Sequence, residues 1–353
     1  WLKPSGRLRP PAGVTAPRFQ RTCGRAVRPG AMERLRVLCG HAAGAPLACA
    51  PAASPAGLAG ERNNVVPDPA ILQAFAADTA WAGKPFWMLN VLKFKDAAKY
   101  NAYGRFMMTE LLPKVGARVV FSGYARTVVG RKEYEQVAIV EYPSPQAFLQ
   151  MAVSNAYAEK HDLRSDGLDE QYLIPMRPGW FHLDRPAPAP TRPIRSFDAR
   201  QAASQPSGLV GAAVVGAREG VTSASRAQAE ALAGDAALGA SEVVWHLNLL
   251  RFARAAGQQS YQGYAKAMGG KAGILPTYGA RSTMSADCFR SLLGDVDFDQ
   301  AIFVEYPSPD AFFSMGASDE YMRVSHLRHQ GLEETYIISC APQVVDTRPV
   351  ANQ

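Results

Sequence analysis

The length, composition and charge of the chain already exclude some functions. Its 353 residues are enough for two domains that each bury a core. The net charge is +7, but residues 1–60 hold nine Lys or Arg against one acid, so that segment carries +8 and the rest of the chain −1. Because the rest lacks the basic excess that contact with a phosphate backbone needs, we expect no nucleic-acid partner.

Residues 1–60 are rich in Arg, Ala and Pro and poor in acids. This composition is typical of a transit peptide for a mitochondrion or plastid, or of a disordered leader on a cytoplasmic protein. The sequence begins at Trp1, and Met32 is a candidate initiator that would shorten the leader. No stretch of the chain is apolar for long enough to span a membrane, so we expect no membrane span.

The cysteines favour a reducing compartment. Three of the five lie in residues 1–60, and the other two, Cys288 and Cys340, form no C-x-x-C pair. We therefore expect neither a disulfide framework nor a structural zinc site. The sequence also contains no phosphate loop, dinucleotide fingerprint, Ser-His-Asp set or H-x-x-x-H spacing.

After the leader, a short helix is predicted before a buried strand. Asp68 can cap a helix that starts at Pro69, because proline suits the first helical position. Residues 86–94 (FWMLNVLKF) are almost wholly apolar, which predicts a strand covered on both faces.

The residues that follow complete a repeating unit. Tyr100, Tyr103 and Leu111 recur at helical spacing and predict an amphipathic helix over 96–112. The next predicted elements are strands over 118–129 and 134–142, a helix over 146–154, a helical turn over 157–164 and a strand over 171–175. This order is the ferredoxin-like βαββαβ arrangement, an α+β fold with an antiparallel sheet and helices on one face.

The same plan occurs twice in the chain. The pentapeptide EYPSP at 141–145 returns at 305–309, and the offset of 164 residues holds over 130–174. This internal duplication predicts two copies of one domain, over 65–183 and 225–343. Between them, residues 184–224 are rich in Pro, Ala, Ser and Gly and predict a partly extended linker, and 344–353 form a tail.

Each predicted sheet has one apolar face that helices do not cover, so each copy needs a partner. Two tandem copies supply that partner within one chain by packing sheet against sheet. We therefore expect an intrachain pseudo-dimeric barrel, with an exchanged homodimer or a larger assembly as the alternative.

With these residues assembled, the chain resembles the DUF1330 family of the dimeric α/β-barrel, ferredoxin-like superfamily. The resemblance rests on the strand from Met88 to Phe94, on the Tyr-Pro-Ser segments with the Phe and Met after them, and on Arg-x-x-x-Leu at 164–168 and 328–332. It covers both repeats but not the leader or linker. It implies the barrel fold, within a superfamily that includes cofactor-free monooxygenases, muconolactone-type isomerases, haem proteins and binding modules.

Polar residues at matched positions of the repeats are candidate substrate-binding groups. Asn90 and Asn248 lie mid-strand among apolar neighbours, where a buried amide either binds a ligand carbonyl or holds adjacent backbone. Two pairs of tyrosines lie three residues apart on one helix face, where they either orient a substrate in a pocket or belong to the core. These pairs are Tyr100 with Tyr103 and Tyr261 with Tyr264.

Two arginines also recur in both copies. Arg118 matches Arg281, and Arg164 matches Arg328. Each either forms a salt bridge, in the case of Arg164 with Glu141 or with the acids at 169–170, or clamps a substrate carboxylate or enolate.

Proton transfer has carboxyl and histidine candidates. Glu141 and Glu305 end a strand, where a partly buried carboxyl with a raised pKa suits a general base, although the next helix dipole alone also favours a carboxylate there. His161 is the histidine candidate. A haem would need an axial ligand such as His161 or His326, but neither is matched in the other copy, so we expect no cofactor and keep haem as the alternative.

Two functions are compatible with this set of residues. The first is a small-molecule enzyme that needs no cofactor, an oxygenase or an isomerase/lyase acting on an enolisable or phenolic substrate. The second is a non-catalytic module that binds a small ligand or serves as an accessory subunit of an organellar assembly. An open pocket lined by Asn90, Tyr103 and an arginine would favour the enzyme, and a third option is that only one half is active.

Overall fold

The structure is a computed structural model that describes residues 67–181, 186–204, 207–211, 213–346 and 348. The expected leader, with its predicted targeting role, lies outside the described residues. No helix within the described ranges is long and apolar enough to cross a membrane.

The first half follows the predicted order of elements. It comprises α2 (Pro69–Ala77), β1 (Phe86–Phe94), α3 (Ala97–Phe106), the π-helical turn η1 (Met107–Leu111), the 3₁₀ turn η2 (Pro113–Val115), β2 (Arg118–Val129), β3 (Gln136–Tyr142), α4 (Pro145–Ala152), α5 (Asn155–Gly167) and β4 (Leu168–Phe181). Local signals start the helices: the Asp68 carboxylate accepts from the amide of Ala70, as predicted, and the Ser144 hydroxyl accepts from that of Ala147.

The second half repeats this plan after the linker. It comprises α6 (Ala199–Ser204), α7 (Arg226–Ala233), α8 (Ala236–Gly239), β5 (Val244–Phe252), α9 (Arg254–Met268), α10 (Ile274–Thr277), β6 (Arg281–Cys288), β7 (Gln300–Tyr306), α11 (Pro309–Gly316), α12 (Asp319–Gly331) and β8 (Leu332–Val345). Both halves are therefore ferredoxin-like βαββαβ units, as the sequence predicts.

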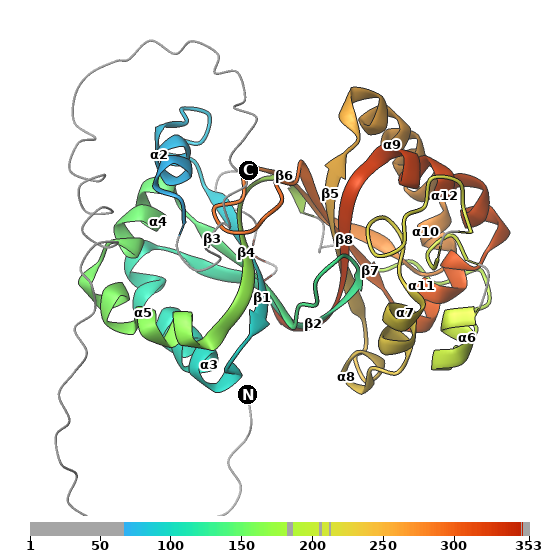
Figure 1. Ribbon diagram of the computed structural model, residues 1–353, viewed down its shortest axis with the longest axis horizontal. Helices are drawn as coiled ribbons and strands as arrows, with labels where there is room; N and C mark the ends of the chain where they lie inside the picture. Colours follow the sequence, from blue (N-terminus) through green and yellow to red (C-terminus); the bar gives the residue numbers. More distant parts are fainter. Residues whose placement is uncertain (1–66, 182–185, 205–206, 212, 347, 349–353) are drawn as a thin grey trace, which may run out of the picture.

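Eight strands close into one barrel in the order β1-β3-β2-β8-β5-β7-β6-β4, and every pairing is antiparallel. Two seams join the halves: β2 pairs with β8, and β4 pairs with β6. The last strand of each half thus pairs with the second strand of the other, which confirms the intrachain pseudo-dimeric barrel. The helices of the two halves lie at opposite ends of Figure 1, with the strands between them.

The last strands are longer than predicted. The sequence predicts a strand over 171–175, whereas β4 covers Leu168–Phe181. The part from Met176 onward pairs with β6 of the other half. This extension depends on a partner that lies more than a hundred residues away, so the local pattern around Pro175 does not reveal it.

Strand β1 shows how the sheet separates two cores. Trp87, Leu89 and Val91 point into the barrel, where they pack with residues of the second half. Met88 belongs to the outer core of the first half, beneath its helices. Because successive side chains of a strand point to opposite faces, an almost wholly apolar run is needed to serve both cores.

The linker packs against the second half. The amides of Thr191 and Arg192 donate to the carbonyl of Thr277, and the amide of Phe197 donates to the Asp310 carboxylate. The described part of the predicted linker is therefore docked on α10 and α11, and it includes the short helix α6.

The seam between the halves makes a specific demand on Gly130. Its φ is 141°, and a Cβ added there would lie 2.2 Å from the ring of Tyr336 in β8. In the same way, a Cβ added at the matched Gly294 would lie 2.0 Å from the ring of Tyr172 in β4.

We therefore predict that Gly130→Ala destabilises the barrel. Backbone strain and overpacking each cost about 1–3 kcal/mol, which corresponds to a fall of about 5–15 °C in the midpoint of thermal unfolding. Gly239→Ala is the control, because nothing lies within 4 Å of a Cβ at that helical position. An unchanged midpoint for Gly130→Ala would show that this contact does not hold the seam together.

Candidate functional site

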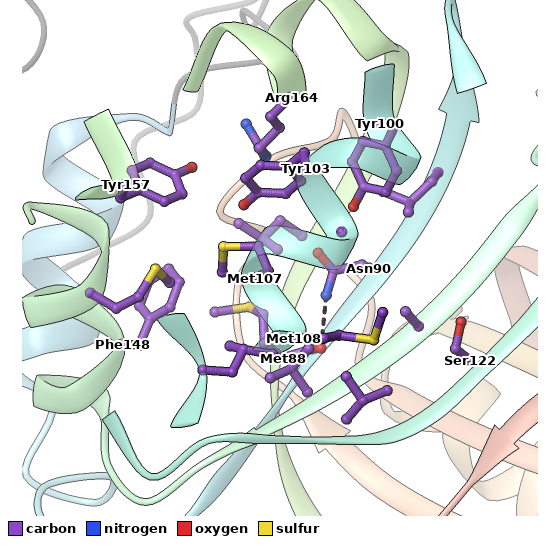
Figure 2. A pocket seen from close by; sticks show the side chains of 18 of the residues that line it. Met88, Asn90, Tyr100, Tyr103, Met107, Met108, Ser122, Phe148, Tyr157 and Arg164 are labelled. Carbon is purple, nitrogen blue, oxygen red and sulfur yellow. Dashed lines mark hydrogen bonds between the residues drawn. The ribbon is translucent and has the colours of Figure 1, made fainter. Parts of the chain in front are cut away.

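A cavity of about 400 Å³ lies in the first half, between the outer face of the sheet and helices α3, α4 and α5. Much of its wall is apolar and includes Met88, Met107, Met108 and Phe148. In Figure 2, Arg164 and three tyrosines lie on one side of the cavity, and Met88, Met108 and Phe148 lie opposite them.

The polar part of the wall includes side chains from β1, α3 and α5. Asn90 of β1 donates to the carbonyl of Met88 at 3.1 Å, drawn as the dashed line in Figure 2. Helix α3 contributes Tyr100 and Tyr103, and α5 contributes Tyr157 and Arg164. The structure therefore contains an open pocket lined by Asn90, Tyr103 and an arginine. Such a pocket is the feature that would favour the enzyme over the non-catalytic module.

Arg164 is the buried charged group of this cavity and is 6% exposed. Its Nη2 donates to the side-chain carbonyl of Gln171 at 2.7 Å. The acids that the sequence offers as partners lie elsewhere: Asp169 pairs with Lys93 at 2.9 Å, and Glu170 pairs with Lys132 at 3.2 Å.

Burial keeps the tyrosines protonated. It raises the pKa of Tyr100 to about 12, against the opposing charge of Arg164, and it raises the pKa of Tyr103 well above 10. Both hydroxyls can therefore donate to a ligand oxygen at neutral pH.

His161 of α5 also lines the cavity, and its ring lies 5.9 Å from that of Tyr157. Burial first, and then the positive charge of Arg164, lower its pKa below the ordinary value of 6.5. The imidazole is therefore neutral at pH 7 and able to accept a proton.

The charged side chains that line the cavity are positive. Within the described part of the chain, the lining includes Arg164 and Arg105 but no aspartate or glutamate. A ligand with an apolar body and an oxygen that carries negative charge suits such a wall.

Two other predicted residues of the first half face away from this cavity. Val140 and Tyr142 line it, so Glu141 between them points toward the barrel interior. Arg118 is the cross-strand partner of Glu141 and donates to its carboxylate at 2.9 Å. The indole of Trp87 donates to the same carboxylate at 3.2 Å.

The second half repeats this ion pair. Arg281 binds Glu305 through two hydrogen bonds, of 3.2 and 3.1 Å. The duplication of the two arginine–glutamate pairs thus reflects one structural contact that is made twice, once in each half of the barrel.

A second cavity occupies the matched position in the second half, but its volume is only about 80 Å³. Asn248, Tyr261, Tyr264 and Arg328 line it. The Asn248 amide donates to the carbonyl of His246 at 3.1 Å, as Asn90 does to that of Met88. The structure therefore brings together the same four polar positions in both halves.

Two differences explain the smaller volume. Ile302 stands opposite Asn248 on β7, whereas the smaller Ala138 stands opposite Asn90. In addition, Leu209 of the linker lines the second cavity and packs on Gly316, where a Cβ would lie 2.0 Å from the leucine side chain.

The linker also needs a small residue at the position that matches His161. That residue is Ser325, and Gly208 packs so closely on it that a Cβ on the glycine would lie 2.8 Å away. His329 holds the same loop, with its Nε2 3.0 Å from the carbonyl of Gly208. His326, the other haem-ligand candidate, lines neither cavity.

Several groups that line these cavities are not among the residues predicted from the sequence. Tyr157 and its counterpart Tyr321 line the two cavities, and their recurrence at the 164-residue offset was a usable signal. Gln343 and Val344 reach the first cavity from the end of β8, and Leu209 enters the second from the linker. No local pattern in the sequence indicates those two contributions.

The fold and the site define an intrachain pseudo-dimeric α/β-barrel protein with a helix-covered cavity in each half. Residues 84–175 match the family described as domain of unknown function DUF1330, and this part of the chain is a DUF1330 domain. Both findings agree with the resemblance noted in the sequence. A comparison with curated proteins finds no match.

Solved structures share parts of this architecture. A protein of unknown function from Rhodopseudomonas palustris is 25% identical, with a TM-score of 0.31, and the match covers 33% of this chain and 98% of that one. A proposed monooxygenase of Lactobacillus acidophilus is 11% identical (TM-score 0.37; coverage 74% and 95%). An anthrone oxidase-like protein is also 11% identical (TM-score 0.40; coverage 74% and 92%).

We predict that Arg164 sets the protonation of His161. NMR titration of the histidine rings should place the His161 midpoint below 6.5, and Arg164→Gln should raise it, because a nearby positive charge disfavours the imidazolium. Arg105→Gln serves as the control, since Arg105 is exposed and is not a cause of the shift. Equal midpoints in the wild type and Arg164→Gln would contradict this electrostatic coupling.

We also predict that the first cavity can be closed by exchanging matched residues. Ala138→Ile places beside Asn90 the side chain that stands beside Asn248, and should weaken binding of the anionic apolar dye 8-anilinonaphthalene-1-sulfonate by at least about tenfold. Ile302→Ala in the second half is the matched control and should leave dye affinity at the first cavity unchanged. Equal losses in both variants would mean that the dye binds elsewhere.

Proposed function

We propose that the first half binds a small organic molecule with an apolar body and an enolisable or phenolic oxygen, and that it acts on this molecule without a cofactor. The reaction would be that of an oxygenase or of an isomerase/lyase. One observation carries the proposal: Arg164, protonated tyrosines and a neutral histidine line one apolar cavity.

In this mechanism His161 removes a proton from the bound substrate and becomes imidazolium. The negative charge then develops on the substrate oxygen, where Arg164 and the hydroxyls of Tyr100 and Tyr103 stabilise it. The low dielectric of the apolar wall, built in part by Met88 and Phe148, strengthens these interactions.

The resulting enolate or phenolate has two fates. Return of the proton to another carbon isomerises the substrate and needs no further reactant. Alternatively, O₂ from solution takes one electron from the anion, the two radicals combine to form a carbon–oxygen bond, and the peroxide takes the proton from His161 to give a hydroperoxide. Both fates share the same first step, so the proposal rests on proton abstraction.

We assign removal of the substrate proton to His161 and not to Glu141. Glu141 faces the barrel and is held by Arg118 and Trp87, so it does not reach the cavity. The second half carries Ser325 in place of His161 and a smaller cavity, which supports a chain with one active half.

A non-catalytic ligand-binding module is the second candidate. Burial keeps the tyrosines protonated, so they do not act as bases at neutral pH. Proton abstraction then depends on His161, whose ordinary pKa lies near neutrality, and this dependence on one group favours a binding module. Such a module would use Arg164 and the tyrosines for binding only.

We predict that the two candidates differ in deuterium exchange. In D₂O under anaerobic conditions, an enzyme of this type should exchange the acidic C–H of a bound compound for deuterium, and mass spectrometry would detect the exchange across a panel of 1,3-diketones and hydroxylated aromatics. His161→Gln should slow the exchange by about 10²–10⁴-fold while leaving binding within a few-fold.

Arg164→Gln should weaken both binding and exchange, by about 10–100-fold in affinity, because a hydrogen bond to a buried charge is lost. Arg105→Gln is the control and should change neither by more than a few-fold. Tight binding with no exchange for any compound would support the binding module, and the absence of binding would contradict both candidates.

A further inference from the structure

The second cavity holds buried polar groups that lack partners. His246 is 1% exposed and stands where the first half has Met88. Within the described ranges, neither of its ring nitrogens has a hydrogen-bond partner. The ring lies against aromatic side chains, with centroids 4.9 Å from Tyr306 and 4.3 Å from Phe312.

Arg328 is the second such group and is 2% exposed. Its Nη1 donates to the carbonyl of Thr222 in the linker, whereas its Nη2 finds no acceptor among the described residues. The lining of the cavity includes no aspartate or glutamate in the described part of the chain. The cavity thus presents a guanidinium N–H and an imidazole with nothing of the protein to bind.

Unpaired polar groups at this depth lower stability unless something fills the space beside them. The volume of about 80 Å³ limits what that is. At roughly 10–15 Å³ of such space for one water molecule, it holds several water molecules or one small organic ion. The larger ligand of the first cavity does not fit, because Leu209 and Ile302 fill the corresponding space.

We propose that the second cavity is a separate binding site for a small monoanion, a carboxylate of the size of formate or acetate. Arg328 Nη2 donates to one carboxylate oxygen, and the N–H of the neutral His246 ring donates to the anion from the sheet side. Asn248 is already committed to the carbonyl of His246, so it shapes the wall without binding the anion.

Different residues at matched positions of the two halves indicate that the second cavity binds a different ligand from the first. The arginine is kept at Arg328, the histidine of α5 is replaced by Ser325, and a new histidine appears on β5 in place of a methionine. Burial lowers the pKa of His246 to about 3, so it is neutral at pH 7 and has one donor to offer. The linker contributes to the size limit, because Leu209 lines the cavity.

The test uses the full chain, labelled at its histidine rings, and titrates it with sodium acetate and sodium formate. The expected result is a saturable shift of the His246 ring signals, with a smaller or no shift at His161. Acetamide, which is neutral and has the shape of acetate, should have no effect. Arg164→Gln should leave the His246 response unchanged, which separates this site from the first cavity.

His246→Met is the matched variant, because methionine stands at that position in the first half. Calorimetry should show acetate affinity lower by about tenfold, the effect of losing one buried hydrogen bond. Arg328→Gln should abolish binding, and should it fail to fold, His246→Met still decides. No response of His246 to acetate at about 100 mM, two orders of magnitude above a millimolar Kd, would overturn the proposal and leave water as the occupant.

Discussion

Closure of the barrel is the constraint on which the rest of the structure depends. An open four-stranded sheet leaves unpaired backbone groups at its edges and one bare apolar face. Here the edges pair across the duplication, β2 with β8 and β4 with β6, and the bare faces become a single interior shared by both halves. The close contacts of Gly130 with Tyr336 and of Gly294 with Tyr172 show that the two seams are built alike.

Because closure uses the inner faces, the outer faces remain free to form sites. Each half encloses a cavity between its sheet and its helices, with an asparagine, two tyrosines and an arginine at matched positions. A single chain lets the two cavities differ, which an exchanged homodimer of identical copies would not. In this chain the first cavity is open and carries His161, whereas the linker enters the second through Leu209.

The parts that could be predicted from sequence are those with a local or a repeated signal. Asp68 and Ser144 start helices by capping, and the repeat exposes Asn90 and Arg164 as candidates in both halves. Because side chains alternate along a strand, Glu141 faces the barrel. The sequence alone does not show which residues point inward, because both faces of this strand are buried. The far ends of β4 and β8 and the position of the linker depend on contacts distant in sequence, so no local pattern revealed them.

Native mass spectrometry of the full chain with an excess of an anionic aromatic compound tests most directly whether the two halves differ. The account predicts one tightly bound molecule per chain, because the first cavity of about 400 Å³ accepts it and the second of about 80 Å³ does not. Two equivalent molecules per chain would contradict the size limit of the second cavity, and none would contradict the ligand site itself.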